Sequence, residues 1–149
     1  MKKLFLFVAV MMTAVVFSSC SKDEDEIPTI IGTWQITHSE GYAEYSDGTR
    51  DDFYEDYPDK YDGFYWTYTF NNDGTFVEQQ LVVGKPTTST PYDYATYSLS
   101  GNTLSITDIT GRTTIFEIKE LTDSQLILYE QAEEAHQKYE HTYIYKRIK

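Results

Sequence analysis

The sequence predicts an all-β fold, an eight-stranded antiparallel up-and-down β-barrel, and three observations lead to it. Beyond residue 60, short segments that alternate apolar and polar residues recur at intervals of about ten to fourteen residues. Clusters of Gly, Asn, Asp and Pro separate these segments. Helical periodicity is absent except at residues 131–136, where a single helical turn fits. Because consecutive strands leave exposed edges unless the sheet closes, we expect a barrel; an open or two-layer sheet is the alternative.

The predicted strands are short, and each is bounded by turn-forming residues. They cover residues 32–39, 64–70, 75–83, 92–99, the segment with Leu104 and Ile106, and residues 115–118, 125–130 and 138–147. The clearest is the second, because every other residue of it is aromatic and falls on one face: Phe64, Trp66, Tyr68 and Phe70.

The turns between these strands are rich in residues that tolerate positive φ angles. Residues 71–74 (Asn-Asn-Asp-Gly) close a hairpin, and residues 100–102 (Ser-Gly-Asn) form a tight turn. Thr110-Gly111 and residues 121–124 supply the next two connections, whereas residues 84–91 form a longer loop. The resulting order is a meander in which each strand pairs with the next.

Residues 40–63, between the first two predicted strands, form an unusual segment with nine acidic, two basic and six aromatic residues. We expect a long loop over the barrel mouth, and such loops are often functional. One interpretation is a calcium site, made of Asp51, Asp52, Glu55, Asp56 and Asp59. A second is a site for a cationic or sugar-like ligand on the rings of Tyr42, Tyr45, Phe53, Tyr54, Tyr57 and Tyr61. A third is a solvated loop whose rings pack on the barrel rim.

The N-terminus resembles a bacterial lipoprotein signal. Lys2 and Lys3 precede an apolar stretch at residues 4–17, and residues 17–20 read Phe-Ser-Ser-Cys. The stretch is shorter than the roughly twenty apolar residues of a membrane-spanning helix, which is the other interpretation. The resemblance implies a signal peptide at residues 1–19 and a lipid anchor of palmitate-type acyl chains on Cys20, which holds the protein on a bilayer.

An acidic run follows Cys20 and resembles the export signal of surface lipoproteins in Bacteroidota. Residues 22–26 read Lys-Asp-Glu-Asp-Glu, and the resemblance implies an outer-membrane protein exposed at the cell surface. The other interpretation is a solvated tether that like charges keep extended. We therefore divide the chain into the signal peptide, an acylated acidic tether at residues 20–28 and a barrel domain at residues 29–149.

Four segments of the barrel domain together resemble the small lipocalin-like domains of Bacteroidota lipoproteins. Residues 31–36 (Ile-Gly-Thr-Trp-Gln-Ile) look like the Gly-x-Trp signature, and residues 68–76, 97–104 and 143–147 complete the order. The resemblance implies a lipocalin-like, calycin-type barrel. It also implies that Gly32 and Trp34 lie at the closed end and that Arg147 covers the Trp34 ring, a cation–π contact.

Composition excludes several functions. Cys20 is the only cysteine, so thiol catalysis and Cys-ligated zinc in the domain are excluded. The net charge of −12 makes nucleic acid a poor partner, because phosphate recognition depends on Lys and Arg. No hydrolase, phosphate-binding or zinc-protease motif is present, and we interpret His136 and His141 as parts of a surface hairpin. We expect neither an enzyme nor a metal or other cofactor.

Fourteen tyrosines point to binding, because a tyrosine ring is apolar while its hydroxyl can still hydrogen-bond. An eight-stranded barrel either fills its interior or holds one small ligand. We expect non-catalytic binding of a small apolar or amphipathic molecule. The wall candidates are Trp66, Tyr68, Tyr94, Tyr97 and Tyr143. The alternative is a surface interaction module with a filled barrel, in which residues 40–63 contact a protein or glycan. The sequence leaves the oligomeric state open.

Overall fold

The computed structural model describes residues 28–85 and 92–149, so the expected signal peptide, Cys20 and most of the acidic tether lie outside the described residues. The described chain forms nine β-strands and no helix. They are β1 (Gly32–Tyr45), β2 (Arg50–Asp56), β3 (Phe64–Phe70), β4 (Thr75–Val82), β5 (Tyr92–Ser100), β6 (Thr103–Thr107), β7 (Thr113–Leu121), β8 (Gln125–Glu134) and β9 (Gln137–Arg147). Among these residues no helix is long and apolar enough to cross a bilayer.

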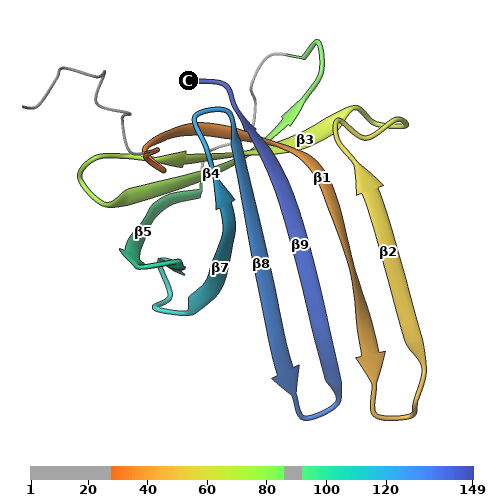
Figure 1. Cartoon of the computed structure of the whole chain (residues 1–149). Coiled ribbons are helices and arrows are strands. Elements are labelled where there is room, and N and C mark those ends of the chain that lie inside the picture. Colours follow the sequence, from red (N-terminus) through yellow and green to blue (C-terminus); the bar gives the residue numbers. More distant parts are fainter. Residues whose placement is uncertain (1–27, 86–91) are drawn as a thin grey trace, which may run out of the picture.

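Eight of the strands close into an antiparallel barrel. β1 pairs with β3, the strands from β3 to β9 pair in sequence, and β9 returns to β1 (Figure 1). The predicted fold class is therefore confirmed, and the open or two-layer alternative is wrong. Closure joins the first and last strands of the meander, which leaves no free edge between them.

The ninth strand corrects the expectation of a long loop at residues 40–63. β1 continues past residue 39 to Tyr45, and β2 runs back beside it, with Gly41 opposite Phe53. The acidic residues conceal a strand alternation: Phe53 faces inward, whereas Asp52 and the exposed Tyr54 face outward. A large number of charged residues in a segment indicates a loop. A strand can nevertheless carry charged residues where they meet solvent.

A bulge in β1 allows this strand to have three neighbours. Residues 32–35 pair with β3, and residues 38–44 pair on the same edge with β2. The register with β9 shifts between Ile36 and His38, and the Thr37 hydroxyl donates a hydrogen bond to the carbonyl of Ile144 at 3.0 Å. Such a bulge bends the strand and increases its twist. The bend therefore directs the second half of β1 away from β3.

A second long hairpin accompanies the first. β8 and β9 stay paired from Gln125–Lys146 to Glu134–Gln137, so residues 131–134 are strand and the helical turn considered for residues 131–136 does not form. The far halves of the two hairpins (residues 38–56 and 129–142) lie side by side in the order β8, β9, β1, β2 (Figure 1). We call this four-stranded sheet the extension.

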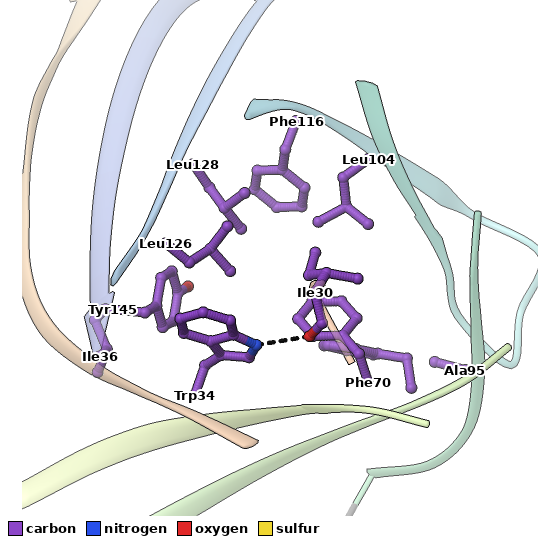
Figure 2. Close-up of a cluster of buried hydrophobic side chains, with 11 residues drawn as sticks. Ile30, Trp34, Ile36, Phe70, Ala95, Leu104, Phe116, Leu126, Leu128 and Tyr145 are labelled. Atoms are coloured by element: carbon purple, nitrogen blue, oxygen red, sulfur yellow. Dashed lines mark hydrogen bonds between the residues drawn. The ribbon is translucent and has the colours of Figure 1, made fainter. Parts of the chain in front are cut away.

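The core fills one end of the barrel. Its largest fully buried side chains come from five strands: Trp34, Phe70, Leu104, Leu126, Leu128 and Tyr145 (Figure 2). The Trp34 indole Nε1 donates a hydrogen bond of 2.7 Å to the carbonyl of Ile30, so its only polar atom is satisfied. Complete burial of a large apolar side chain contributes about 1.5–3 kcal/mol. This end of the barrel is therefore closed and tightly held.

Candidate functional site

Two cavities lie beyond the core and share one wall. The first has a volume of about 390 Å³ and the second about 410 Å³. Trp66 and Tyr68 of β3 and Glu78 of β4 line both of them. Because these side chains stand between the two spaces, we treat the cavities as the first and second lobes of one site. Ligand pockets usually measure about 300–1,000 Å³, so each lobe has room for a small molecule.

The first lobe lies where the extension joins the barrel, and its wall is mainly aromatic. The Tyr57 ring lies 5.4 Å from the Trp66 ring, centroid to centroid, in an edge-to-face contact. The His141 ring lies 3.9 Å from Phe53 and is stacked on Tyr143 at 4.8 Å. The side chains that line this lobe alone are Ile36, Ser39, Phe53, Glu55, Tyr57, His141, Tyr143 and Tyr145.

The second lobe extends across β4 to β7 and mixes apolar and charged side chains. Its floor reaches the core residues Phe76, Ala95 and Phe116, which are all buried. Asp108 and Arg112, in the turn between β6 and β7, stand at its rim and are exposed. The lobe is completed by Gln80, Ile106 and Thr114.

Tyrosine hydroxyls on the inner face donate to carboxylates. Tyr57 donates to Glu55, and the hydroxyls of Tyr139 and Tyr143 donate to Glu130 at 3.0 and 3.4 Å. Burial raises the pKa of Tyr57 to about 12, with the hydrogen bond to Glu55 acting in the same direction. Burial also raises the pKa of Tyr143 above its ordinary value. These phenols therefore stay protonated and act as hydrogen-bond donors at neutral pH.

Glu78 is the polar group at the junction of the lobes. It is half-buried, and burial raises the pKa of its carboxyl above the ordinary value. Among the residues described by the structure, it makes no hydrogen bond or ion pair with another side chain, in contrast to Glu55 and Glu130. Burial lowers the pKa of His141, so this imidazole is neutral at neutral pH. The first lobe thus combines neutral rings with two carboxylates, Glu55 and Glu78.

Comparison with known families supports this description of the barrel. The sequence pattern of the lipocalin-like domain matches residues 30–128, from the segment before β1 into β8. The chain belongs to the lipocalin-like domain family. A comparison with curated proteins found no similar sequence. In lipocalin-like proteins generally, the barrel binds ligands and is non-catalytic.

The Gly-x-Trp segment of this lipocalin-like domain lies at the closed end. The guanidinium carbon of Arg147 is 4.2 Å from the centroid of the Trp34 ring, which is the contact that the resemblance implied. The same guanidinium donates to the carbonyl oxygens of Ile31 at 2.6 Å and Asp123 at 2.7 Å, and also to that of Thr29. Arg147 thereby ties the segment before β1 to the turn between β7 and β8.

Gly32 of the same segment is required by its backbone and by its surroundings. Its φ angle is +133°, a conformation that other residues rarely adopt. A Cβ at this position would lie 2.5 Å from the carbonyl oxygen of Lys149 and 2.6 Å from Arg147 Nη1. The glycine therefore leaves the space through which Arg147 reaches the carbonyl of Ile31.

Three of the five residues proposed as ligand contacts line the lobes. Trp66, Tyr68 and Tyr143 line the lobes. Tyr97 is absent from both linings: its ring lies 5.0 Å from Phe70, and its hydroxyl donates to the carbonyl of Asn71 at 2.9 Å. The side chain of Tyr94 lies outside the described part of the chain.

Sequence reasoning missed the site residues that do not follow from aromatic alternation in the predicted strands. Phe53 and Tyr57 were considered for a cationic or sugar-like ligand and Glu55 for calcium, but not as one wall of a barrel cavity, because residues 40–63 were expected to be a loop. Glu78 had a usable signal: it lies two residues after Phe76 in β4, so the two side chains share the inner face. An acidic residue at an inward position of a barrel strand indicates a polar group in the interior.

The calcium interpretation of residues 40–63 loses its geometric basis. Strand alternation places Glu55 at the first lobe, whereas Asp52 lies in a groove on the opposite face of the extension. Among residues 28–85 and 92–149, no three His, Cys, Asp or Glu side chains form a group that could hold a metal ion. His136 and His141 are also separated, because His136 lies in the turn between β8 and β9.

Proposed function

We propose that this lipocalin-like protein binds a small amphipathic molecule, without catalysis, in the two-lobed cavity. The observation that carries the proposal is the shared aromatic wall of Trp66 and Tyr68 between two spaces of about 390 and 410 Å³. The site matches the usual composition of small-molecule pockets, which are mostly apolar with a few placed polar groups. The closed end is filled by the core, so a ligand enters from the side of the extension.

Titration with an environment-sensitive apolar dye tests this proposal. We expect saturable fluorescence enhancement with about one dye per chain, as for an enclosed site. Ser39→Phe places a ring in the first lobe and Ala95→Phe places one in the second, because each small residue lines that lobe. Either should weaken dye binding, whereas Ser105→Phe on the outer face of β6 should not. Folding of each variant is checked by thermal melting, and absence of saturable binding to the wild-type protein contradicts the proposal.

A surface interaction module remains the second candidate, supported by the two most exposed rings of residues 40–63. Tyr54 and Tyr61 have exposed fractions of 70% and 81%. Three of the other four rings have contacts of their own: Phe53 and Tyr57 face the first lobe, and Tyr42 lies under Arg50 at 3.7 Å. If the dye does not bind, contact with a protein or glycan through Tyr54 and Tyr61 becomes the preferred function.

We also propose that the domain is held at the outer membrane, facing the cell surface, by acylation of Cys20. The support is the signal-like sequence of residues 1–20 and the acidic run after it. Cys20→Ala should move the protein from the membrane fraction to the soluble fraction. Neutralising the four acidic residues at 23–26 should leave it membrane-bound but protected from protease added to intact cells. Retention of Cys20→Ala on membranes contradicts the anchor.

A further inference from the structure

Among the described residues that line the site, acidic side chains outnumber basic ones. Glu55 and Glu78 line the first lobe, and none of the Lys or Arg residues that the structure describes does. In the second lobe Arg112 is accompanied by Asp108 and again by Glu78. Since His141 is neutral at neutral pH, the first lobe is an aromatic chamber with negative charge alone. An anionic amphiphile such as a fatty acid would meet carboxylates there and no opposite charge.

Within the described part of the chain, Glu78 is the carboxylate of the lobes that no side chain pairs with. Glu55 accepts a hydrogen bond from Tyr57, but Glu78 accepts none from a side chain in the described part of the chain. Partial burial of a charge without a partner is unfavourable, and a cation at the same place would offset that cost. Glu78 lies between the lobes, so a positive group beside it can extend its apolar part into either space.

The rings beside Glu78 suit a cation as well. Trp66 and Tyr68 line both lobes together with Glu78, and Tyr68 is opposite Glu78 in the pairing of β3 with β4. Aromatic faces attract ammonium groups, and the attraction strengthens where water is excluded. A carboxylate next to aromatic rings is therefore complementary to an amine that has an apolar body.

We propose that the ligand is an organic cation, an amine with an apolar body, whose ammonium group lies against Glu78 and the rings of Trp66 and Tyr68. This inference rests on the proposed function, because it names the class of molecule that the two-lobed site takes. The apolar part lies in a lobe, and the positive charge lies beside the Glu78 carboxylate.

Three fluorescent probes with the same dansyl group test the charge preference. Dansylcadaverine ends in an ammonium, dansylpentylamide lacks the charge, and dansylaminohexanoic acid ends in a carboxylate. We expect the affinity to fall in that order, with the cation bound about tenfold more tightly than the neutral probe. Equal binding of the cationic and neutral probes, or tighter binding of the anion, overturns the inference but leaves the proposed function intact. Absence of binding by all three overturns both.

Substitution of Glu78 tests whether this residue causes the preference for the cationic probe. Glu78→Gln should bring the ratio of the two affinities, dansylcadaverine over the neutral probe, from about tenfold to about one. Glu120→Gln is the matched control, because it changes the net charge equally at an exposed position outside both lobes. Undiminished preference in Glu78→Gln overturns the assignment to Glu78. Thermal melting monitors folding, and Glu78→Asp, which keeps the charge, should retain part of the preference if Glu78→Gln does not fold.

Discussion

At the scale of single residues, the Arg147 side chain joins several separate segments of the chain. It covers the Trp34 ring at 4.2 Å and donates to three backbone carbonyls, those of Thr29, Ile31 and Asp123. A guanidinium can do this because its planar donors point in several fixed directions, whereas a lysine ammonium has no such fork. The sequence predicted the partner of this side chain from the family resemblance, but the carbonyl contacts follow only from the path of the chain before β1.

Trp34→Ala should be strongly destabilising. The side chain is fully buried in the core, and its loss leaves a large cavity among residues that cannot collapse completely. We expect a loss of about 3–5 kcal/mol in the free energy of unfolding. Urea denaturation measures it, and Trp34→Phe, which retains an apolar ring, should lose less. A loss below that of ordinary surface substitutions contradicts the packing described here.

Arg147→Lys should destabilise although the charge is kept. The lysine cannot donate to the carbonyls of Ile31 and Asp123 together, and it forms a poorer contact with the indole. We expect a loss of about 1–3 kcal/mol, the usual cost of leaving such acceptors unmatched. Lys146→Arg at the exposed neighbouring position serves as the control and should be neutral. Equal stability of Arg147→Lys and the wild-type protein would show that the fork is unimportant.

At the scale of elements, the two long hairpins shape the site. Gly41 of β1 lies opposite Phe53 of β2 and His141 of β9, and the Phe53 and His141 rings contact each other at 3.9 Å. A Cβ on Gly41 would overlap the carbonyl oxygen of Glu140 and lie 2.6 Å from the Phe53 ring. The glycine therefore allows two rings to meet over the backbone of β1 and form one wall of the first lobe.

Gly41→Ala should disturb this wall. The added methyl group forces apart β1 and β9 and displaces the Phe53 ring, so we expect a loss of about 1–3 kcal/mol in stability. The weaker packing should also reduce dye binding in the first lobe. In a double-mutant cycle with Phe53→Ala, the two losses should be less than additive, because removal of the ring relieves one of the two clashes. Strict additivity would mean that the ring does not lie over Gly41.

Some strands could be predicted from the sequence and others could not. Strands with aromatic alternation and Asn-Asp-Gly turns, such as β3 and its hairpin to β4, were located to within a residue. β2 was not, because acidic residues stand on both of its faces and hide the one inward ring, Phe53. The bulge after Ile36 was also invisible, since it depends on how β1 changes partners and not on local composition.

At the scale of the whole molecule, the barrel has two chemically different ends. One is filled by an apolar core under Trp34 and Arg147, and the other holds the lobes with Glu55 and Glu78. The pKa values of three aspartates in exposed turns shift in the opposite direction to that of Glu78. Hydrogen bonds from the Thr side chain two residues later lower the pKa of Asp47, Asp73 and Asp108. The pH dependence of stability therefore contains two opposing contributions.

The difference in stability between Glu78→Gln and the wild-type protein should separate these contributions. The turn aspartates stabilise the fold above their unfolded pKa of about 3.9, and that stability is lost in both proteins as the pH falls through their lower folded values. Glu78 acts in reverse: because its folded pKa is raised, its ionised form destabilises the fold at neutral pH, and the cost disappears below its unfolded pKa of about 4.3.

Glu78→Gln should therefore melt at a higher temperature than the wild-type protein at pH 7, and the two melting temperatures should converge as the solution is acidified. Tyr68 and Tyr145 stay protonated across this range, because burial raises the pKa of both. His141, Glu55, and the pair Asp108 and Arg112 line the same lobes in both proteins, so the part of their contribution that does not depend on Glu78 cancels in the difference. Saturating dansylcadaverine should shift the comparison at pH 7 in favour of the wild-type protein, since a bound ligand stabilises in proportion to the logarithm of its affinity and the wild-type protein binds this cation more tightly. A variant that melts below the wild-type protein at pH 7 without ligand would mean that the protein already neutralises Glu78, and the lobe would then have no unmet charge to attract an amine.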